Sequence, residues 1–117
     1  MQVKGEEMAG TTENERRLVQ KQRRRFTVLK LVREGHENQM SRMDDMELWV
    51  ILLRLGVTMG RNQVRTMLQE LEVLGYLDFK SAHNQASGEL EINQIELTAA
   101  GVRFMDAGRS NDDILVG

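Results

Sequence analysis

The feature that most constrains this fold is a change in hydrophobic spacing at Gly75. Before Gly75, apolar residues recur at intervals of three and four, which predicts a helix over residues 61–74. After it, residues 76–80 and 90–97 have the β-forming composition of two strands, and the polar segment 81–89 between them predicts the loop of a long hairpin. We therefore expect a helix that leads directly into a β-hairpin. The apolar side of this helix consists of Val64, Met67, Leu68, Leu71 and Leu74.

A second short helix is predicted just upstream, over residues 45–55. Asp44 can cap its N-terminus, and Glu47 three residues later resembles a capping box. Gly56 supplies a stop, and the turn that follows is short and contains a glycine. Two helices joined by such a turn are typical of a helix-turn-helix, and a hairpin directly after the second helix would be its wing.

The chain before this unit predicts one long helix. Residues 1–12 have no periodicity and are expected to form a flexible tail, whereas residues 13–34 have an apolar stripe. Residues 35–42 are a polar connector in which Gln39–Ser41 could form a short strand. The apolar stripe consists of Leu18, Phe26, Leu29 and Val32.

The chain after the hairpin predicts a short last helix and a second tail. Thr98 is a good N-cap for a helix that ends at Gly108, and residues 109–117 are expected to form a flexible tail. The predicted fold class is mainly α with a small β-hairpin: a winged helix-turn-helix with a short C-terminal helix. Its single domain would span residues 13–108.

Composition narrows the functional classes. The chain has 117 residues and no cysteine, which removes thiolate metal sites and cysteine nucleophiles. Its two histidines, His36 and His83, lack further ligands at a recognisable spacing. No apolar run is long enough for a membrane helix, and no catalytic motif is recognisable. We therefore expect a cytoplasmic binding protein that uses no cofactor and no metal, rather than an enzyme.

The charges are distributed unevenly although the net charge is only −2. Every charged residue from Arg16 to Arg33 is basic, and this run could follow a phosphate backbone. The predicted hairpin is acidic, which argues against its contacting DNA. The basic residues selected as DNA contacts in the first helix are Arg16, Arg23, Arg24 and Lys30. Those selected on the polar side of helix 61–74, for the major groove, are Arg61, Asn62, Arg65, Thr66 and Gln69.

Three segments carry a resemblance to a known family. Residues 59–77 resemble a winged-helix recognition helix that runs into its wing, and residues 95–101 (Ile-Glu-Leu-Thr-Ala-Ala-Gly) resemble the step after the wing. With Asp-Ala-Gly-Arg at 106–109, the pattern is similar to a small winged-helix family encoded by Mu-like phages and prophages, often labelled ArsR-like regulators. The resemblance covers about residues 25–110 and implies the winged-helix fold. Gly60 departs from the family's usual serine cap, and the missing cysteines mean that metal sensing does not carry over.

Two functions of different classes follow as hypotheses. The first is a DNA-binding, regulatory winged helix of phage or prophage origin, which places helix 61–74 in the major groove of double-stranded DNA. The second is a protein-interaction or assembly module of a phage that uses the same fold without duplex binding, as the net charge and the acidic hairpin would allow. A homodimer is compatible with either hypothesis, because a first helix of this kind often extends beyond the winged-helix core.

Overall fold

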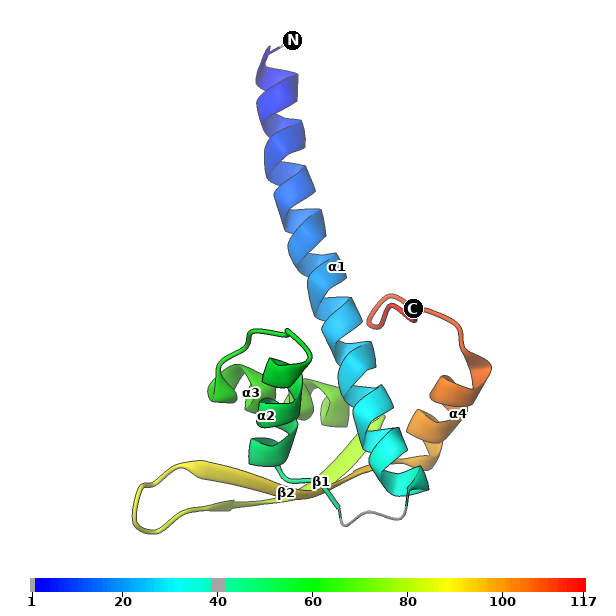
Figure 1. Ribbon diagram of the computed structural model, residues 1–117. Helices are drawn as coiled ribbons and strands as arrows, with labels where there is room; N and C mark the ends of the chain where they lie inside the picture. The colour runs from blue at the N-terminus through cyan, green and yellow to red at the C-terminus, as the bar shows by residue number, and fades with distance from the viewer. Residues whose placement is uncertain (1, 39–41) are drawn as a thin grey trace.

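Four helices and one β-hairpin make up the described part of the chain (Figure 1). This computed structural model describes residues 2–38 and 42–117, with side chains from residue 12 onward. The class predicted from sequence is confirmed at the coarse level: the chain is mainly helical, with a two-stranded antiparallel hairpin and a C-terminal helix. The elements are α1 (Gln2–Glu37), α2 (Asp45–Arg54), α3 (Arg61–Val73), β1 (Leu77–His83), β2 (Leu90–Leu97) and α4 (Ala99–Ala107).

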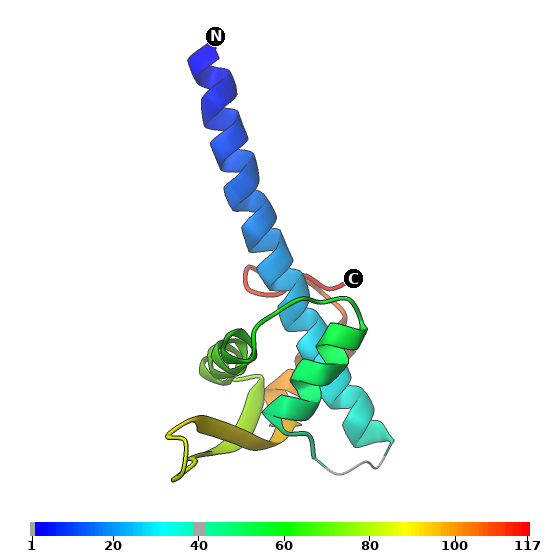
Figure 2. The ribbon, with the colours of Figure 1, turned by 60° about the vertical axis from the view of Figure 1, so that its left-hand side comes forward.

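Helix α1 is longer than predicted at both ends. It spans Gln2–Glu37, so the segment expected to form an N-terminal tail is helical from residue 2. Figures 1 and 2 show that α1 stands out from the rest of the molecule, and residues 12–21 are all exposed. Leu18 lies about three turns before the buried Leu29, and therefore on the same side of the helix, yet it is 53% exposed. Among the described residues, no other element covers this side of α1 at Leu18, so the apolar stripe predicted for residues 13–34 is buried only in its later part.

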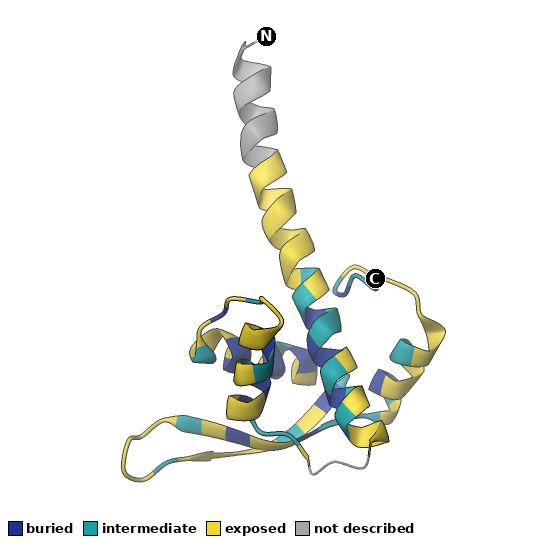
Figure 3. Cartoon of the chain, in the orientation of Figure 1, coloured by how far each residue is buried: buried dark blue, intermediate teal, exposed yellow. Residues whose placement is uncertain are grey.

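The core lies where the second half of α1 meets α2, α3 and the base of the hairpin (Figure 3). On the apolar side predicted for α3, Val64, Met67, Leu68 and Leu71 are buried, as expected. Leu48 and Leu52 of α2 are fully buried. The half-buried Trp49 also ties α2 to the following turn, because its indole N–H donates to the carbonyl oxygen of Met59 at 2.8 Å. The most completely buried side chains are Leu29, Leu48, Leu52, Leu68, Leu71, Leu77, Ile92 and Ile114.

The hairpin is joined to the helices at its base and extends away from them at its tip (Figure 1). Leu77 pairs with Leu97 near the base, and His83 pairs with Leu90 near the tip. The pairing register shifts between Asp78 and Lys80 of β1. On the facing part of β2, Gln94 has a positive φ of 53°. The backbone N–H of Ile95, next to this irregularity, donates to the carbonyl oxygen of Met43 at 3.1 Å. The short strand expected at Gln39–Ser41 lies outside the described residues.

Helix α4 is fixed against the start of the hairpin by one threonine and one glycine. The Thr98 hydroxyl accepts from the Gly101 N–H at 3.0 Å, which caps α4, and donates to the Gly75 carbonyl at 2.5 Å. A Cβ on Gly101 would lie 2.2 Å from the Tyr76 carbonyl oxygen. The Thr-Ala-Ala-Gly step is therefore needed for close packing of α4 on the backbone at residues 75–76.

The last residues are not the free tail that the sequence predicted. Ile114 is fully buried in the core, and the Leu115 N–H donates to the Gln22 carbonyl of α1 at 3.3 Å. The Gln22 side chain donates in turn to the Asp112 carbonyl at 2.7 Å. The apolar Ile-Leu-Val sequence at 114–116 was the signal for this packing. Ile114 inserts into the core, and Leu115 and Val116 beside it are half-buried.

Candidate functional site

The exposed side of α3 retains three of its five predicted contact residues. Asn62, Thr66 and Gln69 are all exposed, one helical turn apart. The Thr66 hydroxyl donates to the Asn62 carbonyl oxygen at 3.0 Å, but the side chains of Asn62 and Gln69 keep free polar groups. The helix begins at Gly60, whose N–H donates to the Gln63 side-chain oxygen at 2.8 Å. The glutamine at the third position thus compensates in part for the missing serine cap.

Arg65 is placed differently from its prediction. Its side chain is only 8% exposed, and its Nε donates to the Asp45 carboxylate at 2.7 Å. Its Nη1 donates to the Asn62 side-chain oxygen at 3.0 Å, and its Nη2 lies 3.8 Å from the Glu89 carboxylate of the hairpin. The prediction that Arg65 lies on the exposed side of α3 is therefore wrong. The residue joins α3 to the start of α2 and to the hairpin.

Arg61 forms an ion pair with the same carboxylate, that of Asp45. Its Nε lies 3.5 Å from Asp45, whose side chain is only 3% exposed, and its own side chain is 28% exposed. One buried carboxylate therefore faces two guanidinium groups. A buried carboxylate without such partners would be costly, which explains why both arginines point towards it. The sequence could not show this contact, because Asp45 and the two arginines lie in different helices.

The arginines and lysines of α1 fall into two groups. Within the part of the chain that the structure describes, Arg16, Arg23, Arg24 and Lys30 form no ion pair. These are the α1 residues that the sequence selected as phosphate contacts. Arg16, Arg23 and Lys30 recur every seven residues and therefore lie near one side of the helix, over a length of about 21 Å. Together they form a line of available positive charge, which we call the α1 cation line, with Arg24 beside it.

The other basic residues of the run have partners. Arg17 pairs with Glu13 at 3.3 Å, and Lys21 pairs with Glu70 of α3 at 2.9 Å. Arg25 is buried, and it donates to Glu70 at 3.2 Å and to the Asp113 carbonyl at 3.0 Å.

Arg33 has two carboxylate partners, Glu37 and Asp106. The hydrogen bond to Glu37 raises the pKa of the Arg33 guanidinium most above its ordinary value, and the hydrogen bond to Asp106 raises it further. These pairs hold α1 to α3, to α4 and to the C-terminal segment. They leave the cation line as the basic surface available to a partner.

Two grooves bring the cation line close to other elements. The first, of about 330 Å³, lies between α1 and α3, with Lys21 and Arg24 on one side and Asn62 and Thr66 on the other. The second, of about 570 Å³, lies between α1 and the turn after α2, and it is lined by Arg16, Arg23 and Arg24 with Gly56 and Val57. Arg24 lines both. The structure thus brings the exposed side of α3 and the basic side of α1 to a shared surface, which the sequence did not predict.

The hairpin has the opposite charge. Asp78, Glu89 and Glu91 are all exposed, and Lys80 is the single exposed basic residue among the charged residues of β1 and β2. Glu96 pairs with Arg42 at 3.1 Å. The acidic character expected from sequence is therefore present on the surface of the hairpin.

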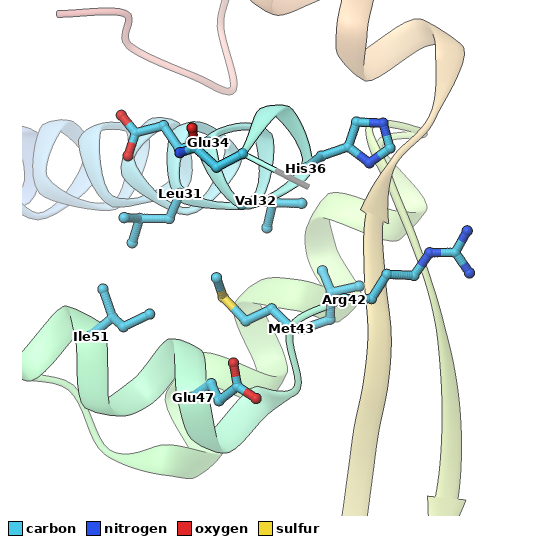
Figure 4. A pocket seen from close by; sticks show the side chains of 11 residues that line it. Leu31, Val32, Glu34, His36, Arg42, Met43, Glu47 and Ile51 are labelled. Carbon is cyan, nitrogen blue, oxygen red and sulfur yellow. The ribbon is translucent and has the colours of Figure 1, made fainter. Parts of the chain in front are cut away.

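A smaller cavity lies between the end of α1, the start of α2 and β2 (Figure 4). It has a volume of about 210 Å³, and Leu31, Val32, Met43 and Ile51 form its apolar walls. Across the described residues, no group of three or more histidine, aspartate or glutamate side chains could hold a metal ion. Among the same residues, no helix is both long enough and apolar enough to span a membrane.

Comparison of the chain with protein-family models, with curated proteins and with solved structures gave no significant match. The resemblance to winged-helix proteins of Mu-like phages therefore stays a prediction.

Proposed function

We propose that this chain is a winged-helix protein that binds double-stranded DNA, with the α1 cation line along the phosphate backbone and α3 in the major groove. The order helix, helix, short turn, helix and hairpin is compatible with a small winged helix. The observation that carries the proposal is the set of basic α1 residues without ion pairs, next to the exposed polar side of α3. A regulatory role in a phage or prophage rests on the sequence resemblance alone.

Phosphate contact is assigned to the α1 cation line and Arg24, because within the described residues these cations have no ion pair to break before they bind. Arg16, Arg23 and Arg24 line one groove together with a single acidic residue, Glu15, so successive phosphates along it would meet mainly guanidinium groups. Contacts of this kind give affinity and orientation without sequence information. Arg61 and Arg65, by contrast, would first have to leave Asp45.

Base contact is assigned to the uncharged side chains of α3. Asn62 and Gln69 can form paired hydrogen bonds with adenine in the major groove, and Thr66 can contact either a base or a thymine methyl group. Arg65 has an indirect role in this arrangement, because it donates to the Asn62 oxygen and so fixes the amide. The hairpin stays away from the duplex, because its exposed carboxylates would repel phosphates.

The test is the salt dependence of duplex binding, measured by fluorescence anisotropy with a labelled random-sequence duplex. We expect the triple variant Arg16→Ala, Arg23→Ala, Arg24→Ala to bind more weakly and to lower the slope of log affinity against log salt by about three. The reason is that each lost phosphate contact releases roughly one counterion fewer.

The matched control removes three exposed basic residues elsewhere: Lys80→Ala, Arg103→Ala, Arg109→Ala. These also form no ion pair in the described chain, so both variants change the net charge equally. We expect the control to keep the wild-type slope. Equal losses in the two triple variants would show a general charge effect and contradict the assigned surface.

A second candidate function has its own observation. The side of α2 away from the core exposes Met46, Val50 and Leu53, which is an unusual surface for a helix that only supports DNA contact. A protein-interaction or assembly module would use such a surface. Under this alternative the chain shows no duplex binding near physiological salt in the anisotropy assay, and the cation-line variant behaves as the wild type.

A further inference from the structure

Helix α2 is apolar on two opposite sides, and the structure covers only one of them. Leu48 and Leu52 face the core and are fully buried. On the other side Met46, Val50 and Leu53 are 46%, 36% and 41% exposed. Their spacing of four and three residues places them in one stripe along the helix, with no charged residue inside it. We call this the α2 stripe.

One charged residue lies beside each end of the α2 stripe. Glu47 is near the N-terminal end and Arg54 is near the C-terminal end, seven residues apart and hence on the same edge of the helix. Both are exposed, and neither forms an ion pair within the described residues. The stripe is therefore flanked on one edge by an unpaired negative charge and an unpaired positive charge. In a second α2 that runs in the opposite direction, the positive and negative charges exchange places along this edge.

We propose that the α2 stripe binds a second copy of this chain, with the two α2 helices antiparallel about a two-fold axis at Val50. Such an axis lies in the interface, so the same edge of each helix faces the same edge of the other. Positions at similar distances on either side of Val50 then lie close to each other, and Glu47 is three residues before it while Arg54 is four residues after it. Glu47 lies beside Arg54 of the partner subunit, and the symmetry repeats this pair. The two apolar stripes cover each other between these pairs.

Helix α1 is the less suitable dimer surface, although its residues 12–21 are all exposed. Arg16, Arg23 and Lys30 form no ion pair within the described residues, and a second α1 laid along this side in parallel would bring like charges together. The α2 stripe has no such conflict. Because it comprises only three apolar residues per copy, we expect a dimer that dissociates on dilution rather than an obligate one.

Charge reversal gives a direct test by sedimentation velocity on the full chain. Glu47→Arg alone places two arginines at each contact, and Arg54→Glu alone places two glutamates there. We expect the wild type to dimerise in a concentration-dependent manner. Each variant alone should dimerise roughly tenfold or more weakly than the wild type. A one-to-one mixture of the two variants has opposite charges at both contacts. We expect it to recover a dimer of the mixed type, identified by native mass spectrometry.

Recovery in the mixture also shows that both variants are folded. As an independent variant, Val50→Glu puts two carboxylates at the axis and should be monomeric with an unchanged circular dichroism spectrum. The proposal is overturned if the wild type is monomeric at all concentrations, or if the single charge variants dimerise as the wild type does. It is also overturned if Leu18→Glu in α1 abolishes the dimer while Val50→Glu leaves it intact.

Discussion

The arginines of α1 and those of α3 have the same chemistry but different degrees of availability. Arg61 and Arg65 occupy the helix that the sequence predicted to read DNA, yet both face the buried carboxylate of Asp45. Arg16 and Arg23 occupy the helix that was predicted to give only general affinity, and they form no ion pair within the described chain. The difference teaches that a basic residue on the expected side of a helix is a candidate contact only once its partners are known.

Substitution of Asp45 is expected to have the largest effect on the difference between the arginines of α1 and those of α3. Asp45→Asn should leave Arg61 and Arg65 without their buried counter-charge, at a cost of about 3–5 kcal/mol in the free energy of unfolding. The measurement is urea denaturation followed by circular dichroism. The control is Glu96→Gln, which breaks the exposed pair with Arg42 and should cost less than about 1 kcal/mol. Similar costs for the two variants would mean that Arg65 is not a structural residue.

Two neighbouring residues of α1 allow the same comparison within one helix. Arg25 is buried and donates to Glu70 and to the Asp113 carbonyl, whereas Arg24 has no ion pair within the described residues. Arg25→Ala should lower the free energy of unfolding by about 2–3 kcal/mol, because charged hydrogen bonds are lost. Arg24→Ala should change it by less than about 0.5 kcal/mol and should weaken duplex binding instead. A stability loss in the Arg24 variant would contradict its assignment to the binding surface.

Arginine-to-lysine substitution sharpens the comparison, because it keeps the charge and removes the planar donor group. Arg65→Lys loses the simultaneous contacts to Asp45 and Asn62, so we expect a loss of about 1–2 kcal/mol in stability. Arg16→Lys should retain both stability and duplex affinity, since a phosphate contact needs mainly charge. Thermal unfolding and anisotropy distinguish the two. The comparison fails if lysine is tolerated equally at both positions.

The smallest expected effect concerns the contact between the hairpin and α3. Glu89 is 60% exposed and lies 3.8 Å from Arg65, so Glu89→Gln should change the free energy of unfolding by less than about 1 kcal/mol. Removing an acidic residue should raise duplex affinity slightly, by about twofold. Glu91→Gln, also exposed on the hairpin, serves as the matched charge control. A larger gain for Glu89→Gln than for Glu91→Gln would show that Glu89 limits the availability of Arg65.

The order of elements could be predicted from sequence because it depends on local patterns. The change of hydrophobic spacing at Gly75, the cap at Asp44 and the cap at Thr98 all act within a few residues, and the structure has the corresponding helices and strands. The bounds of α2, α3 and α4 agree with prediction within one or two residues. The winged-helix assignment itself, like the family resemblance, stays a prediction.

The remaining features depend on contacts between distant parts of the chain. Nothing near Arg65 in sequence indicates that Asp45, twenty residues earlier, would cover it. Likewise Ile114 packs in a core that begins in α1, and Leu18 is exposed because no element of the described chain covers its side of α1. Periodicity gives the side of a helix on which a residue lies. It does not say whether another element reaches that side.

Helix α1 spans two environments, and this implies two very different lifetimes for its backbone hydrogen bonds. From Gln22 onward one side of α1 is covered by the core and by the C-terminal segment, whereas residues 12–21 are all exposed. Amide hydrogens in the covered half should exchange with deuterium only when the whole molecule unfolds, and those in residues 12–21 through local opening. A bound duplex would slow exchange along the exposed half. The difference in exchange rate across Gln22 would then become smaller when a duplex is bound, and so would report binding.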